Sequence, residues 1–391
     1  MSRAVTTAAA VALSVAGLAA CGDDGGEAAT AATVEPGPAP QEPDEIAEGC
    51  GSQAVTNPAD LRADRDVARC GPGAPEPAPL PARTTVRVAV PPAPGEELAP
   101  VLLADRLGEF EAENLEVEIV EEPPGEAMAD LAAGRLDAVA GPLGGAYLDA
   151  VHDGTGARAV LGGALTRAPY RLDTDQTGLW LRRSAVENPD NLSRLESQPV
   201  GVPGGAAGAA LYPVSRAIEE RSGETSIVNL TDVAGDEAAE RLRAGELAAA
   251  WLDGASWLAV ADDADFQLLG TLPATESIDG TVFAQRLTSG PDRAVGVAFV
   301  RAVIRTINTY LTGDYQSDDE VVAALAEATG TDAEAVTATP ALLFDWELRD
   351  GTVERIEEVL LRTGGVGYEE PQPPDRFVDR SLARDAVGAG G

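Results

Sequence analysis

The chain has 391 residues, which is more than one compact core of usual size contains, so two domains or two lobes are expected. Acidic residues outnumber basic ones 65 to 28, the formal net charge is -37, and the sequence contains no lysine. Nucleic acid and anionic lipid would be repelled by such a chain, so neither is expected as a partner, and the charge is typical of a solvated, soluble surface.

The first twenty residues predict a secretory signal peptide. Arg3 precedes an alanine-rich apolar run, residues 4–16, that is too short to span a bilayer permanently. The sequence "LAAC" then ends at Cys21 and resembles the lipobox of bacterial lipoproteins, in which the cysteine becomes the lipid-bearing N-terminus. An ordinary signal cleaved nearby is the alternative. The resemblance implies a signal peptide over 1–20 and a lipid anchor at Cys21 on the outer face of the cytoplasmic membrane.

A tether is predicted over residues 21–83. Its first part has almost no large apolar residues and cannot bury enough surface to fold, whereas the proline-rich part, 71–83, should be extended and stiff. Cys50 and Cys70 lie between these parts, and in an exported protein such a pair is expected to form a disulfide. A metal site would need more ligands than two cysteines.

The folded body begins near Thr84 with an alternating pattern of β-branched residues that predicts a strand. Strands then alternate with helices, which predicts a parallel α/β sheet. The expected elements are a strand at 84–90, a helix-like stretch at 98–114, a strand at 115–122, a helix at 125–136 closed by Gly134, and a buried strand at 137–141.

The same order recurs later in the chain. A strand and a glycine-rich turn precede a helix, and a further strand, helix and strand are expected at 225–233, 236–247 and 248–252. "LAAGRLDAVA" (131–140) and "LRAGELAAAW" (242–251) align helix end, glycine and strand. The likeness is short and chance is an alternative, but the repeated order favours two similar α/β lobes.

The expected binding region is a cleft between these lobes. Ligands of parallel sheets lie beyond the carboxyl ends of the strands, so the turns at 91–97 and 203–208 should face one cleft. The second turn lacks the Gly-Lys-Ser/Thr ending of a phosphate loop, which argues against a nucleotide. Its backbone N–H groups, which suit a carboxylate, sulfonate or other anion, belong to Gly204, Gly205, Ala206 and Ala207.

Residues for catalysis or metal binding are scarce. His152, the single histidine, lies where a helix is expected to end, and a solvated or capping role is expected there. Asp173 and Asp175 imitate the first half of a calcium loop, but its twelfth position is Ser184 instead of glutamate. No enzyme activity, cofactor or metal is therefore predicted.

The succession of segments from Thr84 to Val387 resembles the substrate-binding proteins of ABC importers, in the branch that binds nitrate, sulfonates, taurine and thiamine pyrimidine precursors. The most specific part is "ADRLGEFEAENLEVEIVE" (104–121), in which Asn114 stands where the family usually has glycine. "LAAGRLDAVAGPLGGAYLDAVHDG", "TGLWLRR", "VGVPGGAAGAAL" and "RFVDRSLARDAV" follow in the family's order.

This resemblance implies the class II periplasmic-binding-protein fold, an α/β architecture with two lobes, each a mainly parallel sheet flanked by helices. In this fold the chain crosses twice between lobes, and the crossings are expected near "TGLWLRR" and "DGTVFAQR". Lobe one would then comprise 84–177 and 284–391, and lobe two 178–283.

The resemblance also suggests which residues line the cleft. The turn at 203–208 has no serine or threonine, which anion-binding members often carry, and this weakens nitrate or sulfonate as the solute. Asp253 can accept hydrogen bonds from an amine and Trp257 can stack on a planar ring, with a turn cap and core packing as the respective alternatives. The candidate ligand-binding residues are Pro92, Glu97, Pro142, Leu143, Gly144, Trp180, Gly204, Gly205, Ala206, Ala207, Asp253 and Trp257.

The implied function is capture of a small organic solute (a sulfonate, an amine or a pyrimidine-like molecule) by a monomeric, lipid-anchored protein that delivers it to an ABC permease. An extracellular sensor without transport is the main alternative. A pyrimidine-precursor synthase is a further one, but its cysteine-rich motif has no counterpart, because no cysteine follows Cys70. The sequence does not name the solute.

Overall fold

The computed structural model describes residues 59, 75–165, 176–186, 192, 195, 197–223, 229–273 and 276–388. The chain separates into two compact units, Met1–Glu42 and Pro43–Gly391, and the described residues belong to the second. The predicted signal peptide, lipid anchor and Cys50–Cys70 disulfide lie outside the described residues, as do Asp173 and Asp175.

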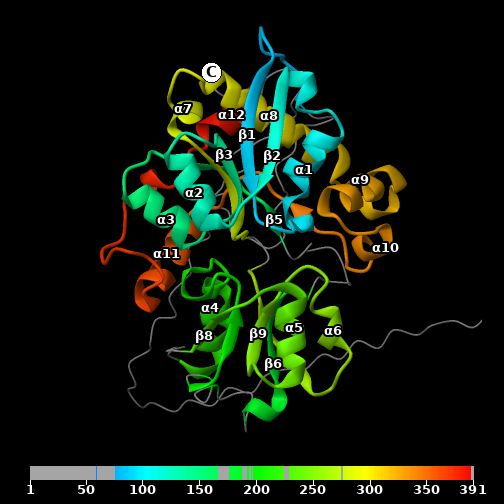
Figure 1. The fold of residues 1–391 in the computed structure, drawn as a ribbon, viewed down its shortest axis with the longest axis vertical. Coiled ribbons are helices and arrows are strands. Elements are labelled where there is room, and N and C mark those ends of the chain that lie inside the picture. Colours follow the sequence, from blue (N-terminus) through cyan, green and yellow to red (C-terminus); the bar gives the residue numbers. More distant parts are fainter. Residues whose placement is uncertain are drawn as a thin grey trace, which may run out of the picture. The chain divides into compact units, whose positions relative to one another are not determined.

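The first sheet has five strands in the order β2-β1-β3-β11-β4, of which β1, β2 and β3 are labelled in Figure 1. Strand β1 pairs in parallel with β2 and β3, whereas β11 is antiparallel to both of its neighbours, β3 and β4. The strands are β1 Thr84–Val90, β2 Leu115–Glu121, β3 Ala138–Pro142, β4 Arg158–Leu161 and β11 Asp279–Phe283.

The second sheet has the order β10-β6-β9-β7-β8. Strand β7 pairs in parallel with β8 and β9, and β6 is antiparallel to β9 and β10. The strands are β6 Gly178–Arg182, β7 Val200–Val202, β8 Leu230–Asp232, β9 Ala249–Leu252 and β10 Phe266–Thr271; a separate two-stranded sheet pairs β5 Ala164–Leu165 with β12 Leu343–Phe344.

Read from opposite ends, the two sheets have the same topology. Each has three parallel strands joined through helices, then one antiparallel strand, then an edge strand. The antiparallel strand in each sheet, β11 or β6, is the one that follows a passage of the chain from the other sheet. The expected α/β class with two mainly parallel sheets is confirmed. The boundary at 177/178 stays a prediction, whereas the one expected at 283/284 lies too late in the chain, because β11 belongs to the first sheet and the chain returns between β10 and β11.

Helices flank the sheets, as parallel strands buried on both faces require. They are α1 Ala99–Arg106, α2 Pro124–Ala132, α3 Gly145–His152, α4 Leu211–Ser222, α5 Gly235–Ala244, α6 Leu258–Ala261, α7 Gln285–Thr288, α8 Arg293–Tyr310, α9 Asp319–Thr329, α10 Ala333–Val336, α11 Thr352–Thr363 and α12 Ser381–Ala386. None of the described helices is both long and apolar enough to cross a membrane.

The two halves of the predicted repeat adopt matching structures. Gly134 follows α2 and Gly245 follows α5, both with positive φ (73° and 79°), and each leads into the third parallel strand of its sheet. A left-handed residue after a helix is a position that glycine fills without steric cost. The expected helix over 98–114 is shorter than predicted, because α1 ends at Arg106 and Gly108 has a φ of 78°.

The apolar core is divided by the sheets. Alternate residues of β1 contribute to different clusters: Val86 and Val88 pack with helices α1 and α8, and Ala89 packs on the α2 and α3 side. The latter cluster also contains residues of the second sheet, including Leu179 of β6 and Val200 of β7. One continuous apolar cluster therefore joins the two sheets.

A buried ion-pair network fixes the proline-rich segment from Pro75 onward. The fully buried Glu113 carboxylate pairs with Arg301 (2.7 Å) and Arg305 (2.8 Å). The same arginines donate to the backbone carbonyls of Ala78 and Pro75, and Ala78 N–H donates to Glu113. Residues 75–83, predicted as the end of the tether, are therefore held against the first-sheet region.

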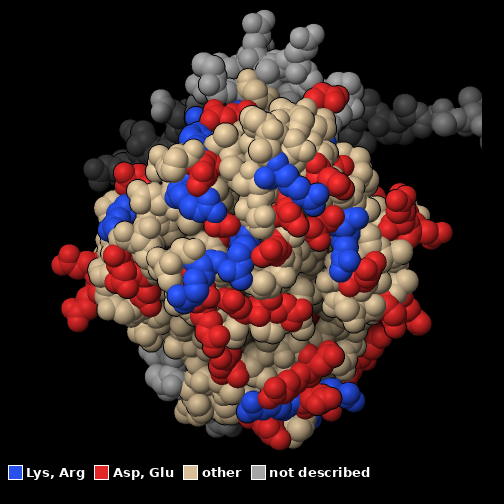
Figure 2. All heavy atoms as spheres, turned by 45° about the horizontal axis from the view of Figure 1, so that its top comes forward, with Lys and Arg blue, Asp and Glu red and all other residues tan. Residues whose placement is uncertain are grey.

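The surface is strongly acidic, and Figure 2 shows Asp and Glu spread over the visible face with Arg among them. Many arginines pair locally, as Arg83 does with Glu116 and Arg106 with Glu327. Exposed pairs contribute only about 0–1 kcal/mol each. The buried Glu113 network is therefore the ionic interaction with the larger effect on stability.

We expect Glu113→Ala to lower the free energy of unfolding by about 3–5 kcal/mol, because it leaves the largely buried Arg301 without a carboxylate and Arg305 with Glu109 alone. Urea unfolding measures the change. Glu327→Ala, which breaks the exposed pair with Arg106, is the control and should cost no more than about 1 kcal/mol. Equal effects of the two substitutions would contradict the importance of the buried network.

Candidate functional site

The turns that follow the strands of the two sheets meet. Gly144, after β3, lies so close to the second-sheet turn that a Cβ atom there would be 2.7 Å from the carbonyl oxygen of Ala207. Gly145 approaches Ala207 and the carbonyl of Gly365, which follows α11. Backbone can approach backbone this closely because glycine has no side chain. The structure thus brings together Gly144 and Ala207, which the sequence predicted on opposite walls of one cleft.

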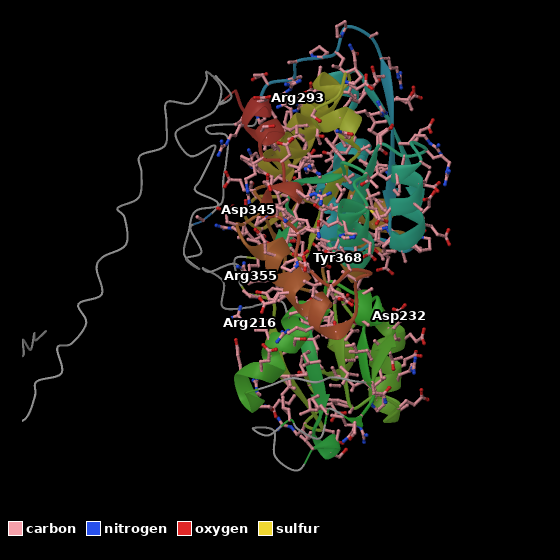
Figure 3. All side chains as sticks on the ribbon, turned by 90° about the vertical axis from the view of Figure 1, so that its left-hand side faces the viewer. Arg216, Asp232, Arg293, Asp345, Arg355 and Tyr368 are labelled. Carbon is pink, nitrogen blue, oxygen red and sulfur yellow. The ribbon has the colours of Figure 1, made fainter. Side chains whose placement is uncertain are left out.

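Two of the four amides predicted to hold an anion, those of Gly204 and Ala207, already have acceptors within the chain. Gly204, with a φ of 77°, donates its N–H to the carboxylate of Asp232 at the end of β8 (2.8 Å). The N–H of Ala207 donates to the carbonyl of Gly204 (3.1 Å). Asp232 is labelled in Figure 3, and its negative charge beside this turn disfavours an anionic ligand.

At the ends of the strands, the charges of two carboxylates act on a third carboxyl group, and the three come from different segments. Asp279 is the first residue of β11, Glu97 lies in the turn after β1, and Asp253 follows β9. Burial, together with the smaller effects of the negative charges of Glu97 and Asp253, raises the pKa of Asp279 to about 8. The site therefore holds Asp279 largely protonated at neutral pH and favours a positive charge nearby.

The β-ladder fixes the place of Asp279. Asp279 pairs with Pro142, the last residue of the neighbouring strand β3, so it lies at the edge of the sheet where β3 ends. Its backbone N–H donates to the Ser277 hydroxyl (3.2 Å), and that hydroxyl donates to the Asp279 carbonyl (3.0 Å), which closes a tight turn. Gly163 packs against both residues. Asp279 is thus held on a strand end and a turn, in the region where α/β sheets place ligands.

The other predicted contacts are distributed unevenly. Pro92 and Pro142 are exposed, Leu143 is fully buried, Gly205 is buried and Ala206 is half-buried. Pro142 also borders a small pocket with Pro91, Glu122, Met128 and Tyr147. Leu143 packs in the apolar cluster shared by the two sheets, so its side chain anchors the turn after β3 in the core.

Both predicted tryptophans lie in the core beside the second sheet. Trp257 is 5% exposed and Trp180 is 3% exposed, and the two share an apolar cluster with Leu242 and Phe266. The indole N–H of Trp180 donates to the Gln176 carbonyl (3.0 Å), whereas that of Trp257 has no hydrogen-bond partner among the described residues. Stacking of Trp257 on a ligand stays a prediction that would require its ring to become exposed.

Sequence reasoning missed Asp279, Asp232 and Gly365, whereas it did place residues 142–145 on the wall opposite the glycine turn. Asp279 opens the segment "DGTVFAQR", where the second crossing was expected, so an acidic residue at the start of a crossing strand was an available signal. Asp232 ends the strand next to the glycine turn. Gly365 offered no signal, because it lies far along the chain and only folding places it against the turn.

Metal ligation finds no support in the part of the chain that the structure describes. No group of three His, Cys, Asp or Glu side chains there is close enough to hold a metal ion.

No protein-family model and no curated protein matches the sequence. Solved structures do resemble it. The nitrate-binding protein NrtA from Synechocystis PCC 6803 has a TM-score of 0.58 at 14% identity, covering 80% of this chain and 89% of its own. The alkanesulfonate-binding protein SsuA from Xanthomonas axonopodis pv. citri, bound to MOPS, has a TM-score of 0.51 at 13% identity, covering 79% and 99%.

A DszB mutant in complex with biphenyl-2-sulfinic acid also matches, with a TM-score of 0.51 at 13% identity over 78% of this chain and 99% of its own. DszB is an enzyme, so this fold is not confined to binding proteins. The chain has the fold of the periplasmic binding proteins. The structural neighbours include nitrate- and sulfonate-binding components of ABC importers, which agrees with the family that the sequence resembles.

The raised pKa of Asp279 predicts a specific pH dependence of stability. This carboxyl ionises near 3.8 when unfolded and near 8 when folded. Between these values the folded state binds the extra proton, so the stabilisation that protonated Asp279 provides is complete below about 3.8 and is lost as the pH rises to about 8.

We therefore expect the wild type to lose stability relative to Asp279→Asn as the pH rises through this window, because asparagine does not ionise. Urea unfolding at a series of pH values measures the difference. Asp262→Asn, at an exposed aspartate, is the control and should run parallel to the wild type. A constant difference between Asp279→Asn and the wild type would show that Asp279 ionises normally.

Proposed function

We propose that this protein is an extracytoplasmic solute-binding protein of an ABC import system. It captures a small organic solute where the strand ends of the two sheets face each other. The fold and the solute-binding proteins among its structural neighbours support this role. So does the meeting of Gly144 and Ala207, because a binding protein of this type must close turns from both sheets around one region.

The solute that the site supports best carries an amine or another cationic group. The observation that carries this proposal is the position of Asp279 within the electrostatic reach of Glu97 and Asp253, each from a different segment. A cation bound there would favour ionised Asp279 and offset the mutual repulsion of the carboxylates. The Asp232 carboxylate at the amide turn supports the same preference over nitrate or a sulfonate.

Export and anchoring complete the proposal. The apolar N-terminus and the lipobox at Cys21 support secretion and lipid attachment, and relatives in fold include a periplasmic sulphonate-binding protein from Escherichia coli. The solute would pass to an ABC permease, and the protein would act as a monomer. A ligand sensor without transport uses the same closing site, and genes for a permease and an ATPase beside this one would favour transport.

A thermal-shift screen over amines, aminopyrimidines, sulfonates and nitrate tests the solute class. We expect amines to raise the melting temperature, since a ligand that binds only the folded state stabilises it. Asp279→Asn and Asp253→Asn should each remove that shift, and Asp262→Asn should retain it. A shift produced only by nitrate or sulfonates would refute the cationic solute. If mass spectrometry shows that the protein chemically changes the ligand during incubation, the result would favour an enzyme over a binding protein.

Lipid anchoring is tested by Cys21→Ala. We expect the variant to leave the membrane fraction and appear in the medium or the soluble extracytoplasmic fraction, because the acyl chains would have no attachment site. Cell fractionation with immunoblotting measures this. Ser14→Ala, within the same N-terminal region, is the control and should stay membrane-bound. A membrane-bound Cys21→Ala protein would exclude the lipoprotein assignment.

A further inference from the structure

Glu276 is a buried carboxylate on the path by which the chain returns from the second sheet to the first. It lies between β10 and β11, is 5% exposed, and donates its N–H to the carbonyl of Pro273 (3.0 Å). A buried carboxylate is costly unless donors surround it. The residues that supply these donors therefore control where this crossing segment is held.

Both oxygens of Glu276 are bound by side chains from two different helices. Tyr212 of α4 donates its hydroxyl to Oε2 (2.8 Å), and Arg355 of α11 donates to Oε1 (2.8 Å). Arg355 Nε also donates to the Tyr212 hydroxyl (3.2 Å), which closes a three-residue ring. Burial and the neighbouring Glu276 charge raise the pKa of Tyr212, so its hydroxyl remains a donor. We call these three residues the crossing clamp.

Helix α11 joins the same regions through apolar contacts. Ile356 and Leu360 belong to the cluster that also contains Leu148 of α3 and Leu211 of α4. Helix α11 packs on both α3 and α4, and Arg362 pairs with Glu219 of α4 (2.9 Å). Figure 3 labels Arg355 of α11 and Arg216 of α4 on the same side of the molecule. Helix α11 thus connects α3 and α4 through apolar contacts, and the crossing clamp adds polar contacts to this connection.

The end of α11 lies at the meeting of the turns. Gly364 ends the helix with a φ of 71°, and Gly365 packs on the carbonyl of Ala206 and beside Gly145. A movement of α4 away from α11 would therefore separate the turn at 205–207 from the first-sheet turn. The clamp and the contact of the turns are parts of one closed arrangement.

We infer that Tyr212, Glu276 and Arg355 are positioning residues that set the equilibrium between the closed arrangement and an open one. They are not among the carboxylates proposed to bind solute, so their loss should weaken solute binding by populating the open state. The consequence for affinity rests on the proposed function, whereas the effect on opening does not.

Amide hydrogen exchange of the full chain without solute, followed by mass spectrometry, tests the inference. Tyr212→Phe deletes one hydroxyl and keeps the ring, and Arg355→Met removes the guanidinium group. Each should raise exchange about tenfold in peptides of α4, α11 and the turn at 204–208, because it removes a hydrogen bond to a buried charge. Peptides of β1 and β2 should exchange as in the wild type.

Arg106→Met is the matched control, since it removes an arginine from an exposed ion pair on α1. Unchanged exchange in α4 and α11 of Tyr212→Phe would overturn the inference, and so would an equal rise in every peptide, which would show a role in global stability only. If Arg355→Met fails to fold, Tyr212→Phe alone decides the matter.

The solute from the thermal-shift screen supplies a second measurement. Calorimetry should give a higher Kd for Tyr212→Phe than for the wild type, because a smaller fraction of the free protein is in the closed arrangement. If no compound in the screen raises the melting temperature, the proposed function is refuted and the exchange result still stands. Normal exchange with unchanged affinity would refute the clamp and leave the proposed function intact.

Discussion

The structure depends on an exchange of strands between two sheets. Strand β11 completes the first sheet immediately after the chain has left the second, and β6 completes the second sheet after the chain has left the first. Both are antiparallel to the strands beside them, because each enters its sheet from the opposite direction. Neither sheet can reach its five-strand order without a crossing, so the crossings fix which strand ends face one another.

This constraint explains why a single strand end carries so much of the site. Asp279 begins β11, so the crossing itself places its carboxyl beside the end of β3. Glu276, three residues earlier, is held by α4 and α11. Glu276 of the crossing clamp and Asp279 of the proposed binding region therefore belong to one short segment, so a displacement of one is expected to displace the other.

The distribution of charge separates this protein from what the glycine turn alone suggests. Free amides before a helix are an anion site. Here Asp232 accepts the N–H of Gly204, and acidic side chains act on Asp279 from both sheets. The same fold that binds nitrate in one structural neighbour and a sulfonate in another can serve a different solute, because the ligand is selected by side chains at the strand ends and not by the sheet order.

The sequence by itself determined the elements whose cause is local. Alternation of apolar residues marked β1 and β2, and Gly134 and Gly245 marked the helix ends of the repeated unit, since only a residue without Cβ occupies a left-handed position freely. It also placed Gly144 and the turn at 203–208 at strand ends. Only the tertiary structure decided that Gly365 closes on that turn and that Trp257 is buried, because both depend on contacts between residues distant in sequence. The ionisation of Asp279 was decided in the same way, since burial and the charges of Glu97 and Asp253 exist only once the chain has folded.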